Sequence, residues 1–313
     1  MDDANPLDLA PLDLDPIEIP TEPLEPASQA VEAALLTVST PGFWESADLW
    51  ATPILASSIV AALLGTVGVY IVLARAAFVS AAVSQLAGLG VVVVLLFFGG
   101  LLDHVEPAAR LGGLAFGVLG TALFAMPVST TRTPNDALLA MAVIAASALT
   151  LVGAATLTSE YQHVQNALYG DAVVAARWEV WLMAGVAVAL LAPERRLRYR
   201  LLFALVDPDS ATAQRVRVTR WRLALGVAIS LAIGLATVVV GALPAFAFSI
   251  LPAATALRFG LPLAGVFVLA PVLGLVAAGL GYYLAFVWAL PVGPTMVAVL
   301  LVPLAASAFR RGD

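Results

Sequence analysis

The chain has no cysteine and no lysine, and only two histidines, His104 and His163, among its 313 residues. The absence of cysteine excludes disulfides, thiol chemistry and cysteine-ligated metals, and it removes any indication of redox compartment. Charge is also scarce, because 12% of the residues are charged whereas 61% are hydrophobic. This composition is typical of a membrane protein rather than of a soluble domain with one core.

The formal charge of −6 originates in one segment at the start of the chain. Nine acidic residues lie between Asp2 and Glu32, and no basic residue precedes Arg75. We therefore predict a disordered, acidic, proline-rich tail over residues 1–40, without the features of a signal peptide, and a transmembrane domain over 41–313. The remainder is net positive, but its basic residues adjoin apolar segments, so we expect contact with a lipid bilayer and not with nucleic acid.

Apolar segments recur along the chain, and about 20 apolar residues suffice to span a bilayer. They predict an all-α, polytopic transmembrane helical bundle of about nine spans. The span at 245–257 is short, and Pro252 interrupts it, so we expect a broken helix whose backbone is satisfied by neighbouring protein. The predicted spans lie at about residues 51–73, 80–101, 108–127, 136–157, 178–193, 222–242, 245–257, 262–285 and 291–308.

The arginines predict how these spans are oriented. With nine spans, only Arg110 and Arg177 fall on one side of the membrane, and the other thirteen arginines fall on the opposite side. The positive-inside rule assigns the arginine-rich side to the cytoplasm. We therefore expect a multi-pass protein of the cell (inner) membrane, with the N-terminus outside and the C-terminus cytoplasmic.

A long basic segment, residues 191–223, contains a helix-start signal. Asp207 provides a carboxylate cap, Pro208 follows at the first helical position, and Asp209 adds a negative charge in the first turn. A helix over about 208–215 would be too short and too polar to cross the membrane. On these residues alone, an ordinary surface helix and a helix that docks a cytoplasmic partner are equally supported.

Four further segments are distinctive: GVYIVLARAAFVSAAVSQLAG, TRTPNDALLAMAVIAASAL, NALYGDAVVAARWEV and VVVGALPAFAFSILPAATALRF. Together with the basic segment, and in the same order, they resemble the permease subunits of metal-uptake ATP-binding-cassette importers, the zinc, manganese and iron family. The basic segment resembles that family's cytoplasmic loop, the first of the four resembles its first-loop pattern, and the last is the most specific match. The resemblance covers about residues 50–310.

The resemblance implies a permease subunit that forms a homodimer and binds two cytoplasmic ATP-binding-cassette ATPase subunits. It also implies that an extracytoplasmic substrate-binding protein delivers the metal ion, most simply zinc or manganese. We expect no catalytic residues and no cofactor bound by this chain, since it lacks a GxxxxGK[ST] phosphate loop; the partner would use the ATP. The residues that would couple to the ATPase are Asp207, Pro208, Asp209, Ala211 and Ala213.

The chain departs from the family pattern at positions that bear on the metal route. The family's aspartate falls at Ala81 and its histidine at Gln85, and Arg215 stands where the family's loop usually has glycine. Zinc and manganese prefer imidazole and carboxylate ligands. Neither group is present at Ala81 or Gln85, so no metal ligands are assigned. Ser84 and Gln85 are the remaining polar groups; helix–helix hydrogen bonding is favoured over lining a passage.

Three alternatives remain at this point. The lost aspartate and histidine allow a permease for a metal chelate or another small solute, or a degenerate, non-conducting membrane subunit. An ion-driven secondary transporter would require acidic residues within the spans, and the span interiors contain none. His104, His163 and the outer segment 160–171 could face a binding protein, but lone histidines are more often surface residues.

Overall fold

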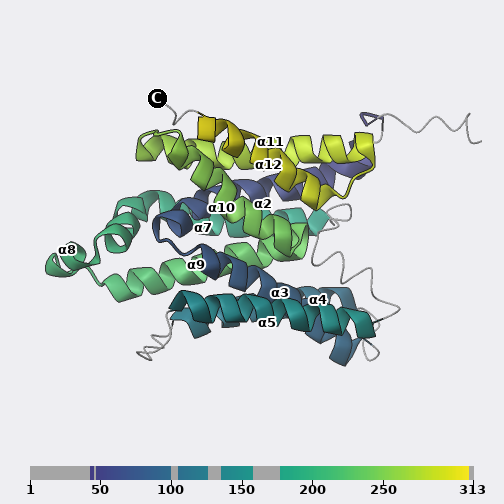
Figure 1. Cartoon of the computed structure of the whole chain (residues 1–313), viewed down its shortest axis with the longest axis horizontal. Helices are drawn as coiled ribbons and strands as arrows, with labels where there is room; N and C mark the ends of the chain where they lie inside the picture. The colour runs from purple at the N-terminus through teal and green to yellow at the C-terminus, as the bar shows by residue number, and fades with distance from the viewer. Residues whose placement is uncertain (1–42, 46, 100–104, 126–134, 158–176, 310–313) are drawn as a thin grey trace, which may run out of the picture. The chain divides into compact units, whose positions relative to one another are not determined.

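The computed structural model describes residues 43–45, 47–99, 105–125, 135–157 and 177–309 (Figure 1). The chain divides into two units, Met1–Gly42 and Phe43–Asp313, and the described residues all belong to the second. The predicted tail over 1–40, both histidines and the segment 160–171 lie outside the described residues. Within the described ranges every regular element is a helix, which confirms the all-α prediction.

Each predicted span falls on one helix, and one further short helix follows α7. Six of the helices, α2, α3, α5, α9, α11 and α12, are long and apolar enough to cross a membrane. The chain is therefore a multi-pass membrane protein, while the number of nine spans remains a prediction. The helices are α2 (Ala47–Leu73), α3 (Ala77–Phe98), α4 (Val105–Ala125), α5 (Asn135–Thr156), α7 (Arg177–Val206), α8 (Pro208–Ala213), α9 (Val218–Val240), α10 (Ala242–Arg258), α11 (Leu263–Trp288) and α12 (Val292–Phe309).

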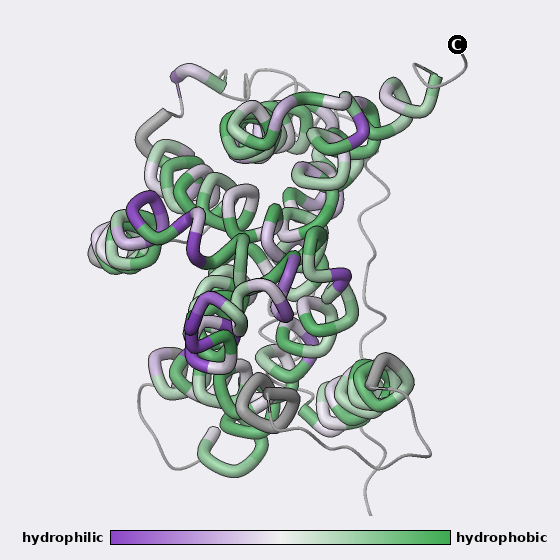
Figure 2. Tube along the Cα trace, turned by 90° about the vertical axis from the view of Figure 1, so that its left-hand side faces the viewer, coloured by the Kyte–Doolittle hydropathy of each residue, from purple (hydrophilic) through white to green (hydrophobic). Residues whose placement is uncertain are grey.

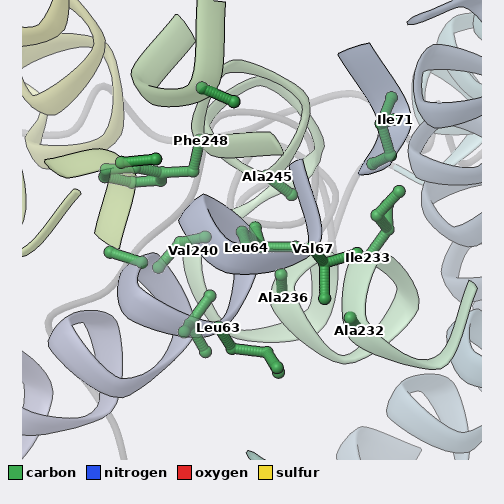
Figure 3. Close-up of a cluster of buried hydrophobic side chains, with 14 of the residues drawn as sticks. Leu63, Leu64, Val67, Ile71, Ala232, Ile233, Ala236, Val240, Ala245 and Phe248 are labelled. Atoms are coloured by element: carbon green, nitrogen blue, oxygen red, sulfur yellow. The ribbon is translucent and has the colours of Figure 1, made fainter. Parts of the chain in front are cut away.

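Helix α2 lies at the centre of the bundle and packs against α7, α9, α10 and α11. Its side chains Leu63, Leu64, Val67 and Ile71 meet apolar side chains of α9 and α10 in one buried cluster (Figure 3). Between helices in lipid, this packing contributes through close van der Waals contact, since lipid tails are as apolar as leucine. The buried cluster therefore depends on shape and on small residues at the helix crossings.

Two glycines of α2 allow that close approach. A Cβ at Gly68 would lie 2.3 Å from the carbonyl oxygen of Ser249 in α10, and one at Gly65 would lie 2.8 Å from the carbonyl oxygen of Ala270 in α11. Backbone oxygens cannot move aside as a flexible side-chain end can. Any larger residue at either position would push α2 away from a neighbouring helix.

Helix α10 corrects one expectation and confirms another. It is short, 17 residues, as predicted, but it is one continuous helix, so the predicted break at Pro252 is wrong. Proline removes one backbone donor, and such a loss is tolerated when neighbouring protein surrounds the helix. Helix α10 is surrounded in this way, because it packs against α2, α3, α9, α11 and α12, and Pro252 is buried.

Candidate functional site

Helix α8 begins as the sequence predicts. The Asp207 carboxylate accepts a hydrogen bond of 3.0 Å from the backbone N–H of Ser210, Pro208 occupies the first helical position, and Asp209 lies in the first turn. These interactions satisfy a donor that the start of a helix otherwise leaves free. They give a helix of six residues a defined beginning between α7 and α9.

The cap also changes how Asp207 titrates. The hydrogen bond from Ser210 to the side chain lowers the pKa of the Asp207 carboxyl, because it stabilises the charged form. A lowered pKa in the folded state means that the cap stabilises α8 above the ordinary carboxyl pKa, and that this contribution is lost as the pH falls through the lowered value. The cap is therefore fully present at neutral pH.

The end of α8 explains why Arg215 has a left-handed backbone conformation. The backbone N–H of Val216 donates to the carbonyl of Ala211, and that of Arg215 donates to the carbonyl of Thr212, both at 2.9 Å. This pair of bonds is the Schellman motif, which requires a left-handed residue, and Arg215 has φ +59°. The predicted helix over about 208–215 therefore ends earlier, at Ala213, and the glycine usual in the related family at this position has a physical reason.

Arg215→Gly is expected to stabilise this helix end by about 1 kcal/mol, because the left-handed conformation costs an L-residue about 1–2 kcal/mol and the added chain freedom of glycine offsets part of the gain. Hydrogen exchange of the amides in 207–216 should slow about fivefold. Arg217, with φ −75°, gives the control, since Arg217→Gly should not slow exchange. Faster exchange in Arg215→Gly would refute this explanation.

The five predicted coupling residues lie on different faces of α8. Ala211 is fully buried within the chain, and Pro208 is half-buried. Asp207, Asp209 and Ala213 are exposed, as are Ser210 and Thr212. Helix α8 thus rests on α7 and α9 through Ala211 and presents a surface of small and acidic residues outward.

A polar network that the sequence did not reveal joins three helices near α8. The Tyr70 hydroxyl of α2 donates to Glu194 Oε1 of α7 at 2.5 Å, and Arg198 donates to both carboxylate oxygens of Glu194 at 2.9 and 3.1 Å. The Arg198 guanidinium lies 4.0 Å from the ring centre of Phe267 in α11. Cation and ring attract each other at this distance. The network therefore ties α7, which leads into α8, to the central helix α2 and to α11.

These contacts also show which helix ends lie together. The end of α2, the second half of α7 and the start of α11 meet at the network, so the connections after α2 and before α11 lie at the α8 end of the bundle. Arg75 and Arg258 belong to this end, together with the arginines beside α8. Figure 2 views the molecule from this side and shows the hydrophilic segments that gather there. The positive-inside rule would place this end in the cytoplasm, and that orientation stays a prediction.

The two residues predicted for a passage have different surroundings. Gln85 is half-buried, and its side-chain oxygen accepts a hydrogen bond of 3.1 Å from the Ser147 hydroxyl of α5. Ser84 is fully buried and donates to the carbonyl of Ala81 in its own helix. One turn earlier, Ser80 is hydrogen-bonded to Ser249 of α10. No local sequence pattern indicates this buried pair between α3 and α10.

Charged metal ligands are not gathered in the described part of the chain, where no three histidine, aspartate or glutamate side chains form a group that could hold an ion. The polar groups buried between α3 and α10 are hydroxyls. The structure assigns no resident metal to them.

Comparison with known proteins yields consistent likenesses. The sequence profile of the ABC 3 transport family matches residues 46–310. The manganese import system permease protein ScaB of Streptococcus parasanguinis is 27% identical over 235 residues, which cover 74% of this chain and 80% of that protein. An uncharacterized membrane protein of Synechocystis, slr2045, is 26% identical over 260 residues, 82% of this chain and 89% of its own length.

The fold has also been observed in a solved structure. PsaBC of Streptococcus pneumoniae, in complex with a Fab, has a chain that superimposes with a TM-score of 0.72 at 22% identity, covering 85% of this chain and 94% of that one. At this identity the likeness concerns the fold. The helix arrangement described above is therefore one that a protein of solved structure also adopts.

Proposed function

This chain belongs to the ABC 3 transport family, and we propose that it is the permease subunit of an ATP-binding-cassette importer for a divalent metal ion. The observation that carries the proposal is α8, a capped six-residue helix that is anchored by buried Ala211 and exposes its remaining surface beside the membrane-spanning helices. A helix with a defined start and end, anchored on one face and exposed on the other, is suited to dock in a partner.

The proposed partner on this side is a cytoplasmic ATPase, which would bind and hydrolyse the ATP, so that this chain itself is not an enzyme. An extracytoplasmic binding protein would deliver the substrate to the opposite side, and two copies of the chain would form the pathway. Closure of the ATPase would move α8, and the Tyr70–Glu194–Arg198 network would transmit that movement from α7 to α2 and α11. Rigid helices joined by such contacts can move as a unit.

Manganese is the metal ion that we propose as substrate, in preference to zinc. The support is the similarity to ScaB, a manganese import permease. Oxygen ligands suit manganese better than they suit zinc, and the polar side chains buried near α10 offer hydroxyl oxygens. A transient site of this kind would bind weakly enough for the ion to leave.

The route within the chain is proposed to follow the seam between α3 and α10, along Ser80, Ser84 and Ser249. Gln85 then serves mainly to hold α3 against α5.

We expect Gln85→Ala to change manganese uptake by less than about threefold, because a hydrogen bond between membrane helices contributes only about 0.6 kcal/mol. Gln85→His, alone or with Ala81→Asp, should change it measurably. Abolition of uptake by Gln85→Ala would place Gln85 in the route.

The orientation can be tested because the chain lacks cysteine. With the α8 end in the cytoplasm, a single cysteine at exposed Ser210 should be shielded in intact cells from an impermeant thiol reagent, whereas one at exposed Ala289 should react. Permeabilised cells provide the control, in which both positions should react. Labelling of position 210 in intact cells would reverse the proposed topology.

Co-purification tests the proposed function at its first step. A tagged copy of the full chain, extracted in mild detergent, should retain a protein with an ATP-binding-cassette phosphate loop, in a ratio near one to one. Recovery of the chain without such a partner, under conditions in which the chain stays folded, would favour the non-conducting alternative.

A further inference from the structure

Four arginines surround an open pocket beside α8. Arg200 comes from the second half of α7, Arg215 and Arg217 from the connection between α8 and α9, and Arg220 from the first turn of α9. Val216, Trp221 and Ala224 form the rest of the lining, and the pocket volume is about 620 Å³. We call this site the arginine pocket.

The positive charge of the arginine pocket is not balanced within the described structure. All four arginines are exposed. The ion pair found on this part of α7 joins Arg198 to Glu194 and does not involve the arginines of the pocket. Two further acidic residues are close in the sequence: Asp207 caps α8 with its carboxylate, and Asp209 lies in the first turn of that helix. Four like charges around one cavity repel each other, and a bound anion would remove that cost.

The backbone adds to the same field. Helix α9 begins at Val218, and no side chain caps its first turn. The N–H groups of Val218, Arg220 and Trp221 donate to backbone carbonyls, so α9 contributes through its dipole. The positive end of this 23-residue helix lies at the arginine pocket, where it favours an anion. Arginines and helix end therefore act on one ligand position.

The apolar lining indicates what kind of anion fits. Helix α9 is one of the membrane-spanning candidates, so its first turn lies at the depth of the lipid headgroups. Trp221 is half-buried against the core of the bundle, and Ala224, one turn further into the span, is exposed. Tryptophan is favoured at the headgroup level, and basic pockets between helices on the cytoplasmic side suit phospholipid headgroups. A soluble anion would gain nothing from Trp221 and Ala224.

We propose that the arginine pocket binds the phosphate headgroup of an anionic phospholipid, with the start of an acyl chain lying along Trp221 and Ala224. The bound lipid joins α7 to the start of α9 and so holds the connection that carries α8. The proposal rests on the chain spanning the membrane and does not depend on what is transported. Loss of lipid binding and loss of metal uptake are therefore separate results.

The test uses the full chain purified in neutral detergent, titrated with phosphatidylglycerol or with phosphatidylcholine and followed by its thermal stability. Phosphatidylglycerol should raise the melting temperature, and phosphatidylcholine should not. In R217Q/R220Q the concentration of phosphatidylglycerol required should rise roughly 25-fold, since each basic residue near an anionic surface contributes about fivefold. The matched control, R195Q/R196Q, removes two exposed arginines of α7 outside the pocket and should respond as the unmodified chain does.

Three results would overturn the proposal. The control R195Q/R196Q could lose the stabilisation by phosphatidylglycerol as fully as R217Q/R220Q does. The stabilisation would then depend on the total positive charge and not on the arginine pocket. Inorganic phosphate at millimolar concentration could stabilise the chain as well as the lipid does, which would make the ligand a free anion. Phosphatidylglycerol could lose its effect when the ATPase is bound, which would assign the arginine pocket to the protein partner.

Discussion

Ala213→Arg is expected to reduce association with the proposed ATPase partner by about tenfold or more while leaving the chain folded. Ala213 is exposed on the outward surface of α8, so the large, charged side chain causes no clash within the chain. In a close-fitting partner cleft, however, the same side chain would cause overpacking, which costs about 1–3 kcal/mol. A tenfold loss of binding affinity corresponds to about 1.4 kcal/mol, within that range. Co-purification of the two subunits at equal expression measures the effect.

Two further variants make this result specific. Ala192→Arg introduces the same change on an exposed position of α7, away from α8, and should leave association unchanged. Ala211→Arg should also reduce association, but by a different cause, since Ala211 is fully buried and the arginine must displace α8 from α7 and α9. Hydrogen exchange in 207–216 should therefore rise in Ala211→Arg and stay normal in Ala213→Arg. Normal association of Ala213→Arg would remove α8 from the docking surface.

Glu194→Ala is expected to destabilise the bundle by about 2–4 kcal/mol. The side chain of Glu194 is 10% exposed and that of Arg198 is 27% exposed, so removing the carboxylate leaves a largely buried cation without its anion. Breaking a buried pair costs about 3–5 kcal/mol, and the partial exposure of Arg198 reduces that figure. Tyr70 also loses its acceptor. Thermal unfolding in detergent should show the loss as a lower melting temperature.

Smaller changes in the same network separate the contributions. Tyr70→Phe removes one hydroxyl and keeps the ring, so it should cost about 0.5–1.5 kcal/mol. Glu194→Gln keeps an acceptor for Tyr70 but removes the charge. The loss of stability that it causes should therefore lie between those of Tyr70→Phe and Glu194→Ala. If Glu194→Ala were no more destabilising than Tyr70→Phe, the ion pair would have no structural role.

Much of the fold was predictable because membrane insertion imposes simple rules on sequence. Apolar length indicated where helices lie, and the arginines indicated which connections share one end, as those near Arg75 and Arg258 do. The start of α8 was predictable because Asp207 and Pro208 act locally, within one turn. Local chemistry of this kind can be read before any tertiary contact is known.

The remaining features depend on contacts between distant residues. Tyr70 and Glu194 are 124 residues apart, and only the spacing of Glu194 and Arg198, four residues along one helix, could have indicated part of their network. The continuity of α10 across Pro252 depends on the helices around it, which a local proline rule ignores. Gln85 turns toward Ser147 of α5, and no local pattern specifies that neighbour.

The proposed function requires that this chain carry a metal ion across a membrane at the expense of ATP hydrolysed by a partner. The most direct measurement is uptake of radioactive manganese into vesicles that contain the chain and its ATPase, with ATP enclosed and the binding protein outside. Uptake should require ATP, should persist when ion gradients are dissipated, and should be lost with Ala213→Arg. Uptake that continues without ATP, or that follows an ion gradient, would contradict the account.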